Sequence, residues 1–243
     1  VNKKTGEKII VGASEAMSKS KKNVVQPEDV IKIYGADSIR WFILSDSPPN
    51  RDIQWSDQGI ASSYKFIQKI WNLTIRTVER KDANGSSNNS KIEKFTNKII
   101  YNITKNLENF QYNVVVANIY EIYNNFDKYL EDKNISNSII KGSLKKVMLL
   151  ITPLIPHIAF ECMEKLNSKI STKDLVWPKY KLDIMQENEC TIVIQVNGRK
   201  RGIIKVSVDL EENMLAQQAK NVTNVKKYFN NKTFVKHIYL KNK

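Results

Sequence analysis

The chain has 243 residues, of which 41% are hydrophobic and 26% charged, as in an ordinary globular protein with one large or two modest domains. No apolar run reaches the roughly 18 residues of a membrane span, and the two cysteines, Cys162 and Cys190, argue against a disulfide framework or a cysteine-based zinc site. A cytoplasmic protein with reduced thiols is expected. The net charge of +14 favours a polyanionic partner such as nucleic acid.

The positive charge is concentrated at one end of the chain. Residues 188–243 carry 11 Lys and Arg against 4 Asp and Glu, which is half of the net charge. Lysine, asparagine and isoleucine are abundant throughout, as an A/T-rich genome also produces. Genome composition does not explain the concentration at one end, so we expect a basic binding surface there.

The loop Ala16–Asn23 is the first stretch with evident chemistry, because small hydroxyl residues alternate with lysines. It follows a predicted short strand at residues 8–11. Small side chains let backbone N–H groups approach an anion, and lysine adds a mobile charge, so the loop suits a phosphate. On these residues alone, a solvated basic loop is an equal alternative.

Two short helices are predicted next. Pro27 and the acids after it begin the first helix, and Gly35 ends it. Asp37 is expected to cap the second helix, which the prolines at 48–49 stop. We expect Arg40 to make a structural ion pair that joins the two helices. The second helix should be mostly buried through its apolar residues, Ile39, Trp41, Phe42, Ile43 and Leu44.

Residues 56–180 predict an antiparallel helix bundle, because apolar residues recur there at helical spacing. The first helix should run from Ser56 to about Arg80, and a flexible hydrophilic connection at 84–90 follows it. The third should end near Glu131, and the fourth should begin near Ser138. The expected core residues are Ile60, Tyr64, Ile67, Ile70, Trp71 and Leu73, then Phe95, Ile99, Ile103 and Leu107, then Val116, Ile119, Tyr120, Tyr123 and Leu130, then Leu144, Val147, Met148 and Ile151.

The aromatic residues of the bundle are interpreted as core rather than as a base-stacking surface. Pro153–Ile158 should interrupt the last helix. His157 lies in that break, and we interpret it as structural because no nucleophile or second ligand lies at a suggestive spacing. Trp177 and Pro178 close the bundle.

The end of the chain changes to the alternating pattern of strands. Residues 191–196 and 203–208 are predicted strands around Asn197-Gly198, a hairpin turn signal. Asp209 and Glu212 resemble a capping box for a helix from Leu210 to about Lys220. Residues 233–240 predict a third strand, which completes a compact α+β module with a basic surface.

Several stretches resemble signatures of the class I aminoacyl-tRNA synthetases. Met17–Ser20 is similar to their K-M-S-K-S loop. Tyr34–Arg40 is similar to the Y-G-A-D-x-x-R of the leucine, isoleucine, valine and methionine enzymes. Ser47–Ser56 and the module around Gln195–Gly198 resemble the bacterial leucyl branch in particular. A valyl, isoleucyl or methionyl fragment fits these two stretches less well.

The resemblance implies a mainly α fold, in which a helix bundle of the anticodon-binding type lies between two other parts. Residues 1–55 would hold the signature loop and the stem-contact region, and residues 56–180 the bundle. A linker at 181–189 would lead to a small α+β tRNA-binding domain at 190–243. The bundle would contact the backbone and shape of the RNA rather than its bases.

The implied activity is ATP-dependent activation of leucine and its transfer to tRNA(Leu). Mg²⁺ is expected with the ATP, and no metal site is expected in this stretch. The family suggests a monomer. By the resemblance, Lys19 would be the catalytic cation, Met17, Ser18 and Ser20 would complete the ATP-binding loop, and Met17 would anchor it by packing. The implied tRNA contacts are Arg51, Asn197, Arg199, Lys200, Arg201, Lys227 and Lys236.

The sequence departs from the family pattern at Ala16, where the signature has its first lysine. Compensation by Lys21 or Lys22 is a hypothesis. The family's H-I-G-H element has no counterpart, since His157 and His237 are the two histidines. We therefore expect a C-terminal piece of a longer polypeptide, inactive alone. A non-catalytic RNA-binding module derived from a synthetase is the alternative.

Overall fold

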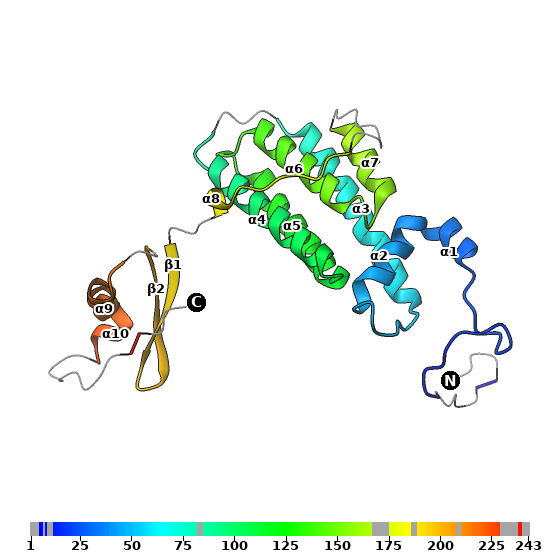
Figure 1. The fold of residues 1–243 in the computed structure, drawn as a ribbon, viewed down its shortest axis with the longest axis horizontal. Helices are drawn as coiled ribbons and strands as arrows, with labels where there is room; N and C mark the ends of the chain where they lie inside the picture. Colours follow the sequence, from blue (N-terminus) through cyan, green and yellow to red (C-terminus); the bar gives the residue numbers. More distant parts are fainter. Residues whose placement is uncertain are drawn as a thin grey trace. The chain divides into compact units, whose positions relative to one another are not determined.

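The computed structural model describes residues 5–6, 8, 12–81, 85–166, 175–185, 189–207, 210–228 and 238–239. The chain divides into two units, residues 1–184 and 185–243. The helices of the first unit are α1 (Pro27–Tyr34), α2 (Ala36–Asp46), α3 (Asp57–Glu79), α4 (Asn89–Glu108), α5 (Tyr112–Glu131), α6 (Asn137–Ile151) and α7 (Pro156–Lys165) (Figure 1). A short helix, α8 (Leu182–Met185), crosses the boundary between the units. The second unit holds β1 (Glu189–Val196), β2 (Arg199–Ser207), α9 (Glu212–Asn221) and α10 (Thr223–Lys226).

Helix ends in the first unit follow local sequence signals. Pro27 opens α1, and Gly35 ends it at a φ of 77°, donating its N–H to the Ile31 carbonyl at 2.8 Å. The Ser56 side chain accepts the Gly59 N–H at 3.0 Å and so caps α3. The helix break predicted at Pro153–Ile158 is confirmed, because α6 ends at Ile151 and α7 begins at Pro156. The predicted role of Asp37 is wrong, since Gly35 occupies the N-cap position of α2.

Helices α3 to α7 pack around one apolar core that also takes in Trp41 from α2. Most of the predicted core residues are buried, but Ile43, Tyr64 and Tyr120 are 45%, 38% and 41% exposed. The periodic pattern also missed a second buried stripe, because helices such as α4 and α5 pack against more than one neighbour. The missed core residues include Phe66, Ile92, Ile100, Val115, Ile122 and Phe126.

The predicted buried position of Trp41 in α2 is confirmed, and its ring packs against two other aromatic rings. The fully buried Trp41 ring stacks on Phe66 with centroids 4.8 Å apart, and its Nε1 donates to the Tyr120 hydroxyl at 3.3 Å. The Tyr120 and Phe66 ring centroids lie 4.1 Å apart. Tyr120 thus packs against the core while remaining partly exposed.

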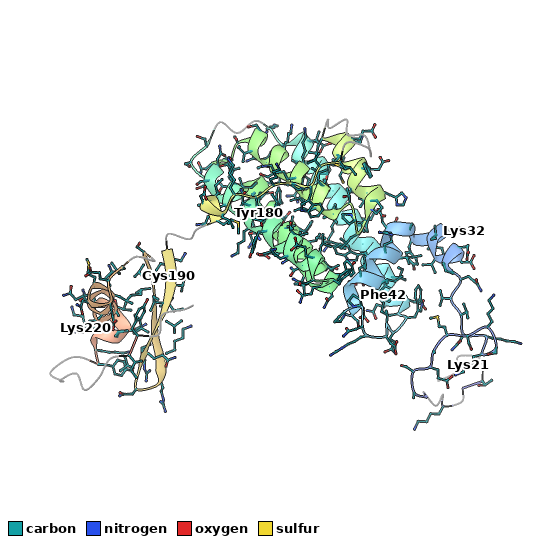
Figure 2. The ribbon with its side chains drawn as sticks, in the orientation of Figure 1. Lys21, Lys32, Phe42, Tyr180, Cys190 and Lys220 are labelled. Carbon is teal, nitrogen blue, oxygen red and sulfur yellow. The ribbon has the colours of Figure 1, made fainter. Side chains whose placement is uncertain are left out.

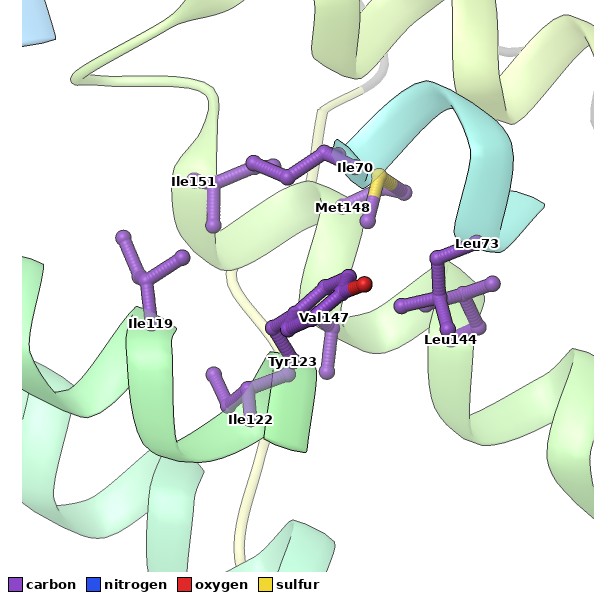
Figure 3. Close-up of a pocket in the computed structure, with 9 residues that line it drawn as sticks. All are labelled: Ile70, Leu73, Ile119, Ile122, Tyr123, Leu144, Val147, Met148 and Ile151. Carbon is purple, nitrogen blue, oxygen red and sulfur yellow. The ribbon is translucent and has the colours of Figure 1, made fainter. Parts of the chain in front are cut away.

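Helices α3, α5 and α6 enclose a small apolar gap (Figure 3). Its volume is about 10 Å³, close to the minimum for one water molecule. At about 24 cal/mol per Å³ such a gap costs only about 0.2 kcal/mol of stability. It is therefore a minor packing defect rather than a ligand site. The lining residues are Ile70, Leu73, Ile119, Ile122, Tyr123, Leu144, Val147, Met148 and Ile151.

The connection before α4 packs more closely than its hydrophilic sequence predicts. Helix α4 begins at Asn89, inside the predicted connection, and the Asn88 side chain donates to the Asp132 carboxylate at 2.8 Å. A Cβ at Gly85 would lie 2.4 Å from the Lys133 carbonyl oxygen. Glycine is therefore needed at this position because two backbone segments approach each other closely.

Residues after the bundle run along α4 before the second unit begins. The Trp177 indole N–H donates to the Thr104 hydroxyl at 2.8 Å, and the Lys181 N–H donates to the Asn97 side-chain oxygen at 2.8 Å. Trp177 thus closes the bundle as predicted, while α8 lies within the predicted linker. No helix in the described part of the chain is long and apolar enough to cross a membrane.

The second unit is built on an antiparallel hairpin of β1 and β2. Asn197 and Gly198 form its turn at φ angles of 52° and 74°, the left-handed pair that a type I′ turn requires. Val206, Leu215 and Val225 are buried where β2, α9 and α10 pack together. The opposite face leaves Val193 and Ile203 about half exposed.

Three predictions for the chain ends lie partly or wholly outside the described residues. These are the strand at 8–11, the capping residue Asp209, and the third strand at 233–240, of which residues 238–239 are described and lie in no strand. Helix α9 begins at Glu212 with Glu211 as its N-cap, two residues after the predicted start.

Arg80, at the C-terminal end of α3, holds the turn between α5 and α6. Its guanidinium donates to the carbonyls of Leu130, Asp132 and Ile135 at 2.9, 2.7 and 2.9 Å, and to the Asn137 side-chain oxygen. These carbonyls include ones that the end of α5 leaves without partners within the helix. A planar fork with several donors suits this arrangement better than an ammonium group.

We expect Arg80→Ala to lower the free energy of unfolding by about 2–3 kcal/mol, because part-buried carbonyls lose charged donors. Arg80→Lys should lose less, since one ammonium can still reach one or two of them. Urea unfolding followed by circular dichroism measures both. Arg51→Ala, at an exposed arginine, is the matched control. Equal stability of the Arg80 and Arg51 variants would contradict the structural role.

Candidate functional site

The loop Ala16–Asn23, called the lysine loop below, contains a tight turn at residues 18–22. The Lys21 N–H donates to the Ser18 carbonyl and the Lys22 N–H to the Lys19 carbonyl, each at 3.2 Å. The Ser18 and Ser20 hydroxyls lie 3.2 Å apart. The turn therefore brings both predicted hydroxyls together and leaves Lys19 exposed next to them.

The Asn23 side chain closes this turn. Its Oδ1 accepts the Ser18 N–H at 2.8 Å, and its Nδ2 donates to the Ala16 carbonyl at 3.4 Å. Both groups of one amide thus bind the backbone on the other side of the turn. The signature resemblance gave no role to this asparagine, although an amide side chain five residues after a serine is compatible with such a bridge.

The lysines of the loop differ in their contacts. Lys21, labelled in Figure 2, lies in this loop. Its Nζ forms an ion pair with the Glu15 carboxylate at 2.7 Å. The side chains of Lys19 and Lys22 are exposed and, within the described residues, have no hydrogen bond or ion pair. The role of Lys19 as the catalytic cation stays a prediction. Met17 is 45% exposed, so the predicted anchoring of the loop by Met17 packing is wrong for this structure.

Asp37, Arg40 and His157 form a structural cluster rather than a catalytic one. Arg40 donates to the carbonyls of Leu154 and Pro153 at 2.7 and 2.6 Å. The predicted ion pair of Arg40 is therefore wrong, although its structural role is confirmed. His157 Nδ1 lies 2.9 Å from the Asp37 carboxylate, which also accepts backbone N–H groups at the start of α7.

The hairpin turn of the second unit gathers three of the predicted tRNA contacts. Asn197, Arg199 and Lys200 are all exposed there. Arg201 differs, because its guanidinium lies 4.8 Å from the centre of the Tyr228 ring and its Nε is buried without a hydrogen-bond partner in the described structure. Lys227 Nζ lies 5.7 Å from the same ring. Sequence reasoning missed Tyr228, which orders these two cations.

The two remaining predicted tRNA contacts are not part of this cluster. Arg51 belongs to the first unit, where its side chain is exposed and its N–H donates to the Pro48 carbonyl at 3.0 Å. Lys236 lies outside the described residues.

The described residues form no metal centre, and the buried Cys162 is not suited to act as a nucleophile. They contain no group of three or more His, Cys, Asp or Glu side chains placed to hold a metal ion. Burial raises the pKa of the Cys162 thiol to about 11, so this cysteine stays protonated at neutral pH. The exposed chemistry of the described chain thus lies in the lysine loop and the basic hairpin.

Two family models match the chain. The model for the anticodon-binding domain of tRNA ligase matches residues 89–216, and the model for class I tRNA synthetases (I, L, M and V) matches residues 9–56. The chain belongs to the anticodon-binding domain family of tRNA ligases. The second model covers the lysine loop together with α1 and α2.

The relatives of this chain are much longer proteins. It is 35% identical to a leucine–tRNA ligase of Bartonella quintana over 86% of this chain and 25% of that protein. The identity to the enzyme of Bradyrhizobium diazoefficiens is 36%, over 84% of this chain and 24% of the relative. The chain thus spans about a quarter of the length of the curated relatives it matches.

Solved structures share the fold of this chain. The ternary complex of Agrobacterium radiobacter K84 LeuRS with tRNA and LeuAMS matches with a TM-score of 0.77 and 21% identity, over 92% of this chain and 29% of that one. Methionyl-tRNA synthetase of Mycobacterium tuberculosis matches with a TM-score of 0.53 and 14% identity, over 65% of this chain and 41% of that one. The mainly α fold of a class I synthetase is therefore confirmed.

We expect Asn23→Ala to loosen the lysine loop, because both side-chain bonds across the turn are lost. The Ser18 amide should exchange with solvent faster, and the heteronuclear NOE of residues 18–22 should fall. Nuclear magnetic resonance of the labelled chain measures both, with the exposed Asn50→Ala as the matched control. An unchanged Ser18 amide would mean that the turn does not depend on Asn23.

Proposed function

We propose that this chain is the C-terminal part of a leucine–tRNA ligase, which activates leucine with ATP and transfers it to tRNA(Leu). The observation that carries the proposal is the lysine loop, in which a tight turn exposes Lys19 beside two hydroxyls. The relatives named leucine–tRNA ligase support leucine rather than valine, isoleucine or methionine as the amino acid. The alternative is a non-catalytic RNA-binding module, which the absence of a signature lysine at Ala16 favours.

In the proposed reaction, the leucine carboxylate attacks the α-phosphate of ATP. The bond from that phosphorus to the bridging oxygen breaks, and pyrophosphate leaves with the electron pair. Negative charge on the phosphate oxygens is stabilised by positioned cations and N–H donors, without a covalent bond to the protein. Lys19 supplies such a cation, while Ser18 and Ser20 shape the turn that carries it.

The chain supplies only part of this active site. Its two histidines, His157 and His237, belong to no H-I-G-H element, so the second ATP-binding element of the family has no counterpart in this sequence. The described residues offer Mg²⁺ no group of three ligands either. We propose that the chain acts within a longer, monomeric polypeptide and does not aminoacylate tRNA alone.

The test is pyrophosphate exchange into ATP by the complete polypeptide that contains this chain, captured from cells with an antibody to residues 56–166. Leucine, valine, isoleucine and methionine are assayed in turn. We expect exchange with leucine alone. Exchange with another of the four would change the amino acid but keep the enzyme class. If the captured protein binds tRNA but shows no exchange with any of the four amino acids, the chain belongs to a non-catalytic RNA-binding module instead.

We propose that the hairpin turn of the second unit contacts tRNA phosphates through Arg199 and Lys200. Both side chains are exposed at the turn. The solved complex of Agrobacterium LeuRS with tRNA supports RNA as the partner. Such contacts position the nucleic acid and do not read its sequence.

Arg199→Ala and Lys200→Ala should each weaken tRNA binding by this chain and reduce the slope of log K against log salt by about 1. The slope falls because each lost contact releases fewer counterions. Filter binding at several salt concentrations measures it. Thr191→Ala, at an exposed uncharged residue of β1 in the same unit, is the control and should keep the slope because it removes no charge. Unchanged slopes for both hairpin variants would contradict the contact.

A further inference from the structure

The lysine loop lacks one of the two cations that the synthetase signature supplies. Ala16 stands where the signature has its first lysine, and a methyl group makes no contact of that kind with a phosphate. The following inference rests on the proposed function, because it concerns the same phosphate site.

The far end of the turn lies next to Ala16. Asn23 Nδ2 donates to the Ala16 carbonyl at 3.4 Å, and Asn23 Oδ1 accepts the Ser18 N–H at 2.8 Å. Lys22 precedes Asn23 in the chain, so its backbone is held close to the position that lost the lysine. The Lys22 N–H also donates to the Lys19 carbonyl at 3.2 Å. This hydrogen bond places the two lysines at the two ends of one tight turn.

Lys21 is the less suitable of the two nearby lysines. Its ammonium group forms an ion pair with Glu15 at 2.7 Å, so its charge is already offset within the loop. Lys22 is exposed and, among the described residues, its side chain has no hydrogen bond or ion pair. Its charge is therefore not offset by any described residue.

The backbone of Lys22 is unfavourable for its residue type. Its φ is 53°, in the left-handed region that glycine and asparagine adopt far more readily than lysine. A strained position held by surrounding contacts is a reason to suspect a function for its side chain. Glycine would adopt this backbone conformation more readily but would lack the positive charge, so the charge is the property that lysine adds at this position.

We propose that Lys22 is a further catalytic residue, which binds the ATP phosphates in place of the first signature lysine. It acts as the second cation beside Lys19. Both ammonium groups stabilise the oxygens of the β- and γ-phosphates, which gain negative charge as pyrophosphate leaves with the electron pair of the broken bond. No proton is transferred, and both lysines stay charged throughout.

The variant Lys22→Gly removes the side-chain charge without opposing the backbone conformation, because glycine adopts a positive φ more readily than lysine does. In the complete polypeptide, we expect Lys22→Gly to lower kcat/KM for ATP in leucine-dependent pyrophosphate exchange by about 10- to 100-fold, the usual effect of losing one charge-assisted contact. Lys21→Ala, the matched control, should lower it less than about fivefold, because an exposed ion pair contributes little. If position 22 were only structural, Lys22→Gly would keep full activity.

Restoring the signature lysine provides the second test. Ala16→Lys in the Lys22→Gly background should recover most of the lost kcat/KM, whereas Ala16→Lys alone should change it less than about fivefold. Full activity of Lys22→Gly, equal losses in the Lys21 and Lys22 variants, or no recovery by Ala16→Lys would each overturn the assignment of Lys22. Absence of exchange in the unmodified polypeptide would instead overturn the proposed function, and the role of Lys22 with it.

Discussion

The position of the N-terminal helices on the bundle depends on one turn of α2, in which Asp37 and Arg40 bind opposite sides of the same helix break. The Asp37 carboxylate accepts the Ile158 N–H at 2.7 Å at the start of α7, and Arg40 donates to the Leu154 carbonyl at 2.7 Å just after α6. An acid at a helix N-terminus and a base near a C-terminus each match the local dipole. Since Pro156 and the N-cap residue Ile155 offer α7 no side-chain cap, Asp37 provides one from 121 residues away.

A distant side chain also binds the backbone groups at the turn between α5 and α6. Arg80 at the end of α3 takes the place of local caps there, and its donors reach carbonyls on both sides of the turn. Helices broken by proline or by short turns leave backbone groups that need partners when they are not fully solvated. Side chains distant in the sequence meet that need in this chain, so formation of the turns and packing of the bundle depend on each other.

Local features were therefore predictable from sequence, and distant partnerships were not. The helix start at Pro27 and the turn at Asn197-Gly198 each follow from the backbone preference of one or two residues. Asp37 was assigned to its own helix because a capping pattern contains no information on a second helix 120 residues later. Likewise, the period of α4 and α5 identified one buried face, but only the packing partners determine a second. The domain boundaries remain predictions.

In the candidate site, too, residue types were predictable from sequence and contacts were not. Its residue types were evident from sequence, and so was the lack of a lysine at position 16, but Lys21 and Lys22 were equivalent until their contacts were known. The loop is held by an exposed ion pair and two hydrogen bonds from Asn23, contributions of about 0–1 and about 1 kcal/mol each. The left-handed backbone of Lys22 opposes them by about 1 kcal/mol. Contacts within the loop are therefore weak compared with the charged hydrogen bonds and the buried Trp41 that fix α2 to the bundle. The rigid part of this region is α2, and the loop before it depends on a few exposed contacts of its own.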